Sequence, residues 1–147
     1  MHSSCHKYEL KDLKKMRRKR DEYLLHNAVI EKDLDKVKSL IKDGWDVNET
    51  DYNHWTPLHY ATQDGMDNIT ETLIENGAEI DVKDDYGNTP LSNAIYNSNV
   101  GNSVEVIKIL LKNGADKFLK NNYGVSPYSL ANEMMGGEPL VKLLDSI

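Results

Sequence analysis

The chain of 147 residues contains a single cysteine, Cys5, and one phenylalanine against eight tyrosines. One cysteine excludes an intrachain disulfide and a zinc site built from several cysteines. With so little phenylalanine, the core has to be thin and built from Leu, Ile, Val and Ala, which suits a repetitive architecture. No apolar run approaches the roughly 18–20 residues of a membrane span, and the basic N-terminus has no hydrophobic stretch of the signal-peptide type. We therefore expect a cytoplasmic protein.

The net charge of −6 hides a strong asymmetry along the chain. Residues 1–20 carry eight basic and two acidic side chains, a net charge of +6, whereas the remainder carries ten basic and 22 acidic ones, a net charge of −12. An acidic body repels polyanions and attracts basic partners. The sequence therefore predicts a protein partner with a basic contact surface and argues against nucleic acid as a ligand of the body.

Three motifs recur in one phase along the chain. The run Thr-Pro-Leu-His-x-Ala begins at Thr56, and related runs begin 33 residues later, 37 residues after that, and in degenerate form 33 residues before it (Thr89, Ser126, Tyr23). A glycine follows each of the first three runs by 21 to 25 residues (Gly44, Gly77, Gly114), and a turn residue precedes each of the last three by five (Asp51, Asp84, Asn121). Such phased motifs indicate internal structural repeats.

Each motif predicts a local structure. Thr56 and Thr89 can cap a helix through the side-chain oxygen, and the proline that follows suits the first helical position, where its missing N–H costs nothing. The glycines lie where a helix ends in a left-handed residue. The Asp and Asn residues with their neighbours carry the chemistry of tight turns. We expect pairs of short helices joined by projecting turns.

The pattern Asp-x-x-Gly-x-Thr-Pro-Leu-His-x-Ala, followed by Leu-Leu/Ile-x-x-Gly-Ala, resembles the ankyrin repeat over about residues 22–147. The resemblance implies an all-α solenoid of about four helix–loop–helix repeats with β-turn fingers along one edge. The repeats would span about residues 22–50, 51–83, 84–120 and 121–147. In this framework His26 and His59 would hydrogen-bond the backbone between repeats rather than act in catalysis.

Some features depart from the repeat pattern. The third repeat is four residues too long, and the excess falls in a polar loop, residues 98–103, which is either a tolerated insertion or a partner contact. His54 replaces the glycine of its finger, where a residue with positive φ is expected. Trp45 replaces an alanine and is expected to cover the exposed end of the stack, the alternative being contact with a partner.

The basic segment of residues 1–21 lies outside the repeats. Leu10, Leu13 and Met16 recur at helical spacing, so residues 9–20 are predicted to form a helix that caps the first repeat. A solvated tail, or a patch that contacts nucleic acid or a membrane surface, are the alternatives. Three potential metal ligands near the terminus (His2, Cys5, His6) form too weak a pattern to predict a metal site.

The resemblance also predicts where a partner binds, because ankyrin-family proteins typically use the finger tips and the exposed sides of the first helices. The corresponding residues are Tyr52, Asn53, His54, Trp55, Gln63, Asp64, Asp85, Tyr86, Asn88, Tyr96, Asn97, Asn122 and Tyr123. Tyrosine and tryptophan give large contact areas at low entropic cost, and asparagine gives adaptable hydrogen bonds. We expect Trp55 and Tyr86 to be the anchors. The alternative is that Trp55 only braces its own finger.

No phosphate loop, nucleophile elbow, HExxH motif or paired-carboxylate motif appears, and a thin solenoid offers no deep cleft. The prediction is therefore a protein-binding module that masks or scaffolds a partner, without enzymatic activity, cofactor, metal or small-molecule substrate. A short acidic ankyrin chain resembles bacterial immunity proteins, so inhibition of a basic toxin is the specific hypothesis. The alternative is a regulatory adaptor whose basic N-terminus contacts nucleic acid or anionic membrane.

Overall fold

The computed structural model describes residues 22–98, 104–134 and 136–147, and in this part of the chain the regular structure is entirely helical. The helices are α2 (Leu24–Ile30), α3 (Leu34–Lys42), α4 (Pro57–Gln63), α5 (Asp67–Glu75), α6 (Pro90–Tyr96), α7 (Val104–Lys112), α8 (Pro127–Glu133) and α9 (Glu138–Ser146). The helix predicted over residues 9–20, the residues His2, Cys5 and His6, and most of the 98–103 insertion lie outside the described residues.

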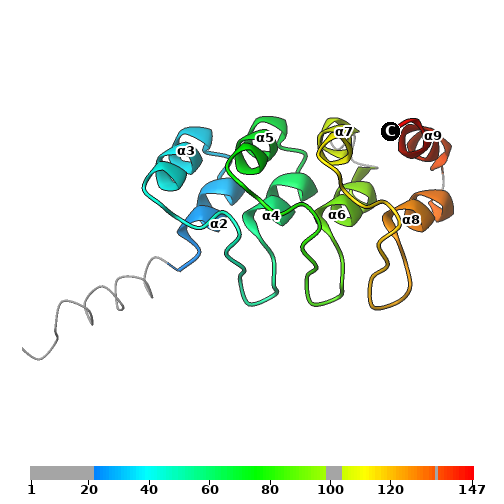
Figure 1. Cartoon of the computed structure of the whole chain (residues 1–147), viewed down its shortest axis with the longest axis horizontal. Coiled ribbons are helices and arrows are strands. Elements are labelled where there is room, and N and C mark those ends of the chain that lie inside the picture. The colour runs from blue at the N-terminus through cyan, green and yellow to red at the C-terminus, as the bar shows by residue number, and fades with distance from the viewer. Residues whose placement is uncertain (1–21, 99–103, 135) are drawn as a thin grey trace, which may run out of the picture.

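The helices form four antiparallel pairs that stand side by side in a row (Figure 1). The first helices of the pairs pack on one another as an inner layer, α2 on α4, α4 on α6 and α6 on α8. The second helices form an outer layer, with α3 on α5 and α5 on α7. Three loops project from the row, between α3 and α4, α5 and α6, and α7 and α8 (Figure 1). The all-α solenoid of four repeats is confirmed.

The hydrophobic core is a thin layer of aliphatic side chains between the inner and outer helices. Its largest fully buried members come from both layers and from every repeat (Leu25, Leu58, Leu73, Leu91, Ile95, Ile107, Leu110, Leu144). Buried alanines on the inner helices (Ala28, Ala61, Ala94, Ala131) let neighbouring repeats approach closely. Because each repeat buries its apolar face only against its neighbours, the stack is stabilised repeat by repeat.

Helix boundaries lie where the motifs predict them. The side-chain oxygens of the three caps (Thr56, Thr89, Ser126) each accept a hydrogen bond from the N–H three residues later, at 3.4, 3.3 and 3.1 Å. A proline follows each cap. The glycines after the second helices have φ of 92°, 94° and 89° (Gly44, Gly77, Gly114), the left-handed conformation that ends a helix.

The two framework histidines connect neighbouring repeats as expected. His26 Nε2 lies 2.9 Å from the carbonyl oxygen of Trp55, and His59 Nε2 lies 3.2 Å from that of Asn88. The Thr56 N–H donates to His59 Nδ1 at 3.1 Å. His59 is therefore the neutral tautomer with its proton on Nε2. It is fully buried, and burial lowers its pKa.

Trp45 is half-buried and packs against the core at the repeat that contains α2 and α3, which agrees with a covering role at this end of the stack. None of the helices in the described part of the chain is long and apolar enough to cross a membrane.

Candidate functional site: a groove beneath the fingers

The three fingers share one turn geometry. The first residue of each (Asp51, Asp84, Asn121) uses its side-chain Oδ1 to accept hydrogen bonds from the N–H groups two and four residues later, at 2.9–3.0 Å. An Asp or Asn side chain that satisfies two backbone donors fixes the loop locally. The fingers are therefore similar in shape, and what differs between them is the set of side chains that they present.

Neighbouring fingers are also connected to one another. The N–H of Asp85 donates to the carbonyl of Asn53 at 3.2 Å, and one finger further on the N–H of Asn122 donates to the carbonyl of Tyr86 at 3.0 Å. Side chains repeat the pattern, with Trp55 Nε1 donating to Asp84 Oδ2 at 3.0 Å and Asn121 Nδ2 donating to Asn88 Oδ1 at 2.9 Å. These contacts hold the three fingers as one row.

His54 occupies the finger position that glycine holds in the other two fingers. Its φ is 59°, so the expected left-handed conformation is confirmed. The imidazole Nδ1 lies against the carboxylate of Asp85 on the next finger, and both side chains are exposed. His54 thus links the tips of two fingers, and an exposed pair of this kind contributes little stability.

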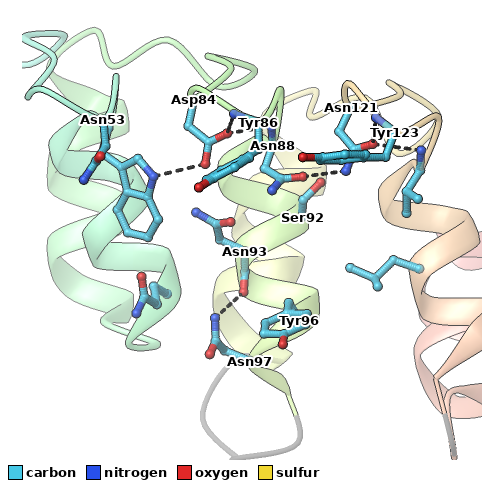
Figure 2. Close-up of a pocket in the computed structure, with 14 residues that line it drawn as sticks. Asn53, Asp84, Tyr86, Asn88, Ser92, Asn93, Tyr96, Asn97, Asn121 and Tyr123 are labelled. Carbon is cyan, nitrogen blue, oxygen red and sulfur yellow. Dashed lines mark hydrogen bonds between the residues drawn. The ribbon is translucent and has the colours of Figure 1, made fainter.

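A groove of about 760 Å³ runs beneath the fingers and along the inner helices α4, α6 and α8 (Figure 2). Its walls are Asn53, Trp55, Gln63, Asp84, Tyr86, Asn88, Ser92, Asn93, Tyr96, Asn97, Asn121, Tyr123, Val125 and Leu130. The labelled side chains hang from the fingers at one edge and project from α6 at the other (Figure 2). The groove is therefore continuous across three repeats.

The groove unites most of the residues that the sequence predicts for partner binding (Asn53, Trp55, Gln63, Tyr86, Asn88, Tyr96, Asn97, Tyr123). The other predicted residues lie outside its lining (Tyr52, His54, Asp64, Asp85, Asn122). Three of those connect fingers, since Asn122 Nδ2 donates to the Asp85 carbonyl at 3.0 Å and Asp85 meets His54. Tyr52 is exposed and its ring lies edge-on to that of Tyr23.

Trp55 is both a wall of the groove and a brace between repeats. It is half-buried, its ring stacks on His59 with centroids 5.6 Å apart, and it lies 4.9 Å from the ring of Tyr60. Its indole N–H donates to Asp84 on the next finger. Trp55 thus connects two neighbouring repeats, rather than bracing its own finger alone, and it also lines the groove.

The groove tyrosines, in contrast, are open to solvent. Tyr86, Tyr96 and Tyr123 are 59%, 70% and 74% exposed. Tyr86 and Tyr123 hang from successive fingers, and Tyr96 lies on α6 below Tyr86 (Figure 2). Large exposed aromatic side chains that share one groove are typical of protein-binding surfaces.

The lining also contains residues to which the sequence gives only a turn role or no role in binding (Asp84, Ser92, Asn93, Asn121, Leu130). Asn93 is the informative omission. It precedes the predicted residue Asn97 by four positions, and side chains four apart share a helix face. The four-residue spacing from Asn97 is the feature of the sequence from which a position of Asn93 in the groove could have been predicted.

Charge is segregated across the stack. The segments that form the fingers and inner helices, residues 51–64, 84–97 and 121–134, contain no Lys or Arg and five acidic residues (Asp51, Asp64, Asp84, Asp85, Glu133). We call these segments the groove side. Six lysines lie instead on outer helices (Lys36, Lys38, Lys42, Lys108, Lys112, Lys142). Among the residues that the structure describes, no three His, Cys, Asp or Glu side chains gather in a way that could hold a metal ion.

The sequence of this chain is similar to those of known proteins. A family model described as ankyrin repeats (3 copies) matches residues 6–84 and 25–121. Protein phosphatase 1 regulatory subunit 27 of Mus musculus is 44% identical over 66 residues, 45% of this chain and 43% of that protein. Serine/threonine-protein kinase 12 of Arabidopsis thaliana is 40% identical over 79 residues, 54% of this chain and 16% of the kinase. The human 2-5A-dependent ribonuclease is 38% identical over 71 residues, 48% of this chain and 10% of the enzyme.

The chain thus spans less than half the length of each of these relatives. The match to the family model agrees with the phased motifs, the capped helix pairs and the row of fingers. Ankyrin repeats are protein–protein interaction modules. The chain belongs to the ankyrin repeat family.

Proposed function

We propose that this protein binds a partner protein in the groove beneath its fingers and masks part of the partner's surface. The observation that carries the proposal is the placement of Tyr86, Tyr96 and Tyr123, exposed and facing one groove that crosses three repeats. Aromatic side chains in such a position supply most of the binding free energy of many interfaces. Hydrogen bonds between the fingers also lower the entropic cost of binding, because the finger loops are already ordered before the partner binds.

The charge of the groove side supports a basic contact surface on the partner. Five acids and no Lys or Arg lie in the fingers and inner helices of three repeats. Asp64 and Glu133 are exposed at the far ends of α4 and α8 from the fingers. Complementary charge around a hydrophobic centre steers association and rejects acidic partners.

Masking a basic surface is the action of an inhibitor, so we propose inhibition or regulation of a basic partner as the biological role. A toxin neutralised by an immunity protein is one partner of this kind. One relative is named as a regulatory subunit of protein phosphatase 1, and a small chain that regulates by docking is compatible with that description.

The test is capture of binding proteins from cells of the source organism on the immobilised chain. The variant Tyr86→Ala/Tyr123→Ala removes two groove aromatics, and Phe118→Ala removes an equally exposed aromatic outside the groove (60% against 59% for Tyr86). The proposal expects a protein that the wild type and Phe118→Ala retain and that the double variant loses. Equal retention by all three chains, at unchanged melting temperatures, would contradict it.

A further inference from the structure

The groove presents two exposed aromatic side chains at equivalent positions of neighbouring fingers. Tyr86 and Tyr123 each lie two residues after the Asp or Asn whose side chain fixes the turn. They are 59% and 74% exposed, so a partner can contact both of them. In the close-up, the side chain of Asn88 lies between the two rings (Figure 2). The groove thus repeats one aromatic contact from one finger to the next.

The stack sets the distance between these two contacts. The N–H of Asn122 donates to the carbonyl of Tyr86 at 3.0 Å, so the two fingers are direct neighbours. Each finger has two arms, and hydrogen-bonded extended chains lie about 4.7–4.9 Å apart, which places equivalent residues of successive fingers about 9.5 Å apart. The inner helices α6 and α8 pack on each other, and packed helices lie about 8–10 Å apart. The side chains of Tyr86 and Tyr123 therefore start about 9.5 Å apart.

This distance matches the period of one kind of peptide chain. A polyproline II helix has three residues per turn and rises about 3.1 Å per residue, so residues three apart lie on one face about 9.3 Å apart. An extended strand returns to the same face every second residue, at about 6.6 and 13 Å, and matches neither contact. An α-helix comes close with residues seven apart, at about 10.5 Å.

The polar lining of the groove favours the polyproline II segment over the α-helix. Six lining side chains are carboxamides, against one acid and no base. The acid, Asp84, already accepts two backbone N–H groups and the indole N–H of Trp55. Asn88 Oδ1 accepts from Asn121 Nδ2 at 2.9 Å, which leaves the amide N–H groups of Asn88 to donate to a ligand. A polyproline II chain exposes its carbonyls and needs such donors, whereas an α-helix pairs its carbonyls internally.

We propose that the groove binds a proline-rich segment of the partner in the polyproline II conformation, with two prolines three residues apart against Tyr86 and Tyr123. Aromatic grooves bind such segments because the rigid chain loses little entropy on binding. Basic residues that flank the prolines would lie toward Asp64 and Glu133, at the ends of α4 and α8 away from the fingers. This inference rests on the proposed function and specifies the part of the partner that enters the groove.

The first experiment selects a phage-displayed library of random linear 12-residue peptides on the immobilised whole chain. We expect the enriched peptides to share two prolines separated by two other residues. Failure of the library to enrich any peptide, or enriched peptides without this spacing, would overturn the inference.

The spacing is then tested in a synthesised peptide of the enriched sequence. One alanine is inserted between the two prolines, and a control peptide carries the same extra alanine at its C-terminus. The insertion moves the second proline by about 3.1 Å and turns it by about 120° away from its ring. It should therefore weaken binding at least about ten-fold, while the control peptide binds like the parent. Equal affinity of the two lengthened peptides would contradict the inference.

Variants of the chain test whether the two rings make the contact. Tyr86→Ala and Tyr123→Ala should each weaken peptide binding at least about ten-fold, while Tyr86→Phe and Tyr123→Phe, which keep the rings, stay within about three-fold of the wild type. Phe118→Ala, which removes an exposed aromatic side chain outside the groove, should leave the affinity unchanged. Alanine variants that bind like the wild type, or whose lost binding is explained by a fall in melting temperature, would refute the inference.

The two proposals fail in different ways. A captured partner that Tyr86→Ala/Tyr123→Ala loses, together with a library that enriches no prolines at this spacing, leaves the proposed function standing and refutes the inference. A captured partner and enriched peptides that the double variant binds as well as the wild type does refute both.

Discussion

The groove side and the outer helices are built from the same repeats but differ in what they expose. The groove side carries acids, carboxamides and open tyrosines without a Lys or Arg, whereas α3, α7 and α9 carry interspersed Lys, Asp and Glu. Ion pairs on the outer helices are local and exposed, as between Lys142 and Glu138 at 3.0 Å. Such mixed charge keeps a surface soluble without selecting a partner. This difference in composition is the reason why we assign partner binding to the groove side in our proposal rather than to the outer helices.

The largest expected effect comes from removing the groove tyrosines. Tyr86→Ala/Tyr123→Ala should weaken binding to the captured partner by about 100-fold, or about 2.7 kcal/mol at 1.36 kcal/mol per decade. The melting temperature should change little, because both side chains are exposed. Titration calorimetry and thermal unfolding measure the two quantities. A loss of stability with normal affinity of the folded fraction would instead make the groove side structural.

Replacing Trp55 should affect both the stability of the fold and the binding of the partner. Trp55→Phe removes the indole N–H that donates to Asp84 while keeping an aromatic ring over His59. Loss of that hydrogen bond to a carboxylate should lower the free energy of unfolding by about 1.5–3 kcal/mol, with a smaller loss of partner affinity. Urea unfolding measures the first quantity. Unchanged stability would show that the bond contributes nothing and that Trp55 is free to act as an anchor alone.

Two finger glycines allow a matched test of the contact between fingers. Gly87 and Gly124 have φ of 78° and 76°. A Cβ at Gly87 would lie 2.7 Å from Asn122 Oδ1 and 2.9 Å from its backbone nitrogen, whereas a Cβ at Gly124 would meet nothing within 4 Å. Both Ala variants incur the left-handed penalty of about 1–2 kcal/mol. Gly87→Ala should destabilise the fold further in urea unfolding, and equal effects would show that the fingers do not hold one another.

Much of this architecture could be predicted from the sequence because it is local and repeated. The caps at Thr56, Thr89 and Ser126, the left-handed glycines, the positive φ of His54 and the histidine links all follow from the motif at each position. The brace formed by Trp55 could not be predicted in the same way, since its partner Asp84 is set by the stacking of two repeats. The shielded, unpartnered side-chain atoms of Gln63 and Asn93 could not be predicted from the sequence either, because shielding from solvent depends on how neighbouring helices pack.

Acid should weaken the stack at one interface between repeats. The folded-state pKa of His59 lies below the ordinary value of 6.5 because the ring is buried. The unfolded chain therefore binds the proton more readily, so the contribution of this group is fully present above pH 6.5 and is lost as the pH falls below it. His59→Ser, which copies Ser92 of the next repeat, should flatten that part of the pH profile of stability. An unchanged profile would assign the acid sensitivity to other groups.

Charge should give the smallest effect, visible in association rates. Asp64→Asn/Glu133→Gln on the groove side should lower the rate and weaken its dependence on salt, because exposed charges steer encounter. Glu71→Gln/Glu75→Gln on the outer helix α5 removes the same charge and should change the rate less. Stopped-flow measurements at two ionic strengths compare them. Equal effects of the two pairs would mean that net charge, rather than the groove side, attracts the partner.

Site-specific photo-crosslinking in the source cells tests most directly whether the partner lies in the groove. A photoreactive phenylalanine derivative replaces Tyr96, an exposed groove residue, in one chain and Lys112, an exposed residue at the end of α7, in another. We predict that position 96 forms a covalent adduct with a protein partner and that position 112 does not. An adduct from position 112 with none from position 96 would contradict it.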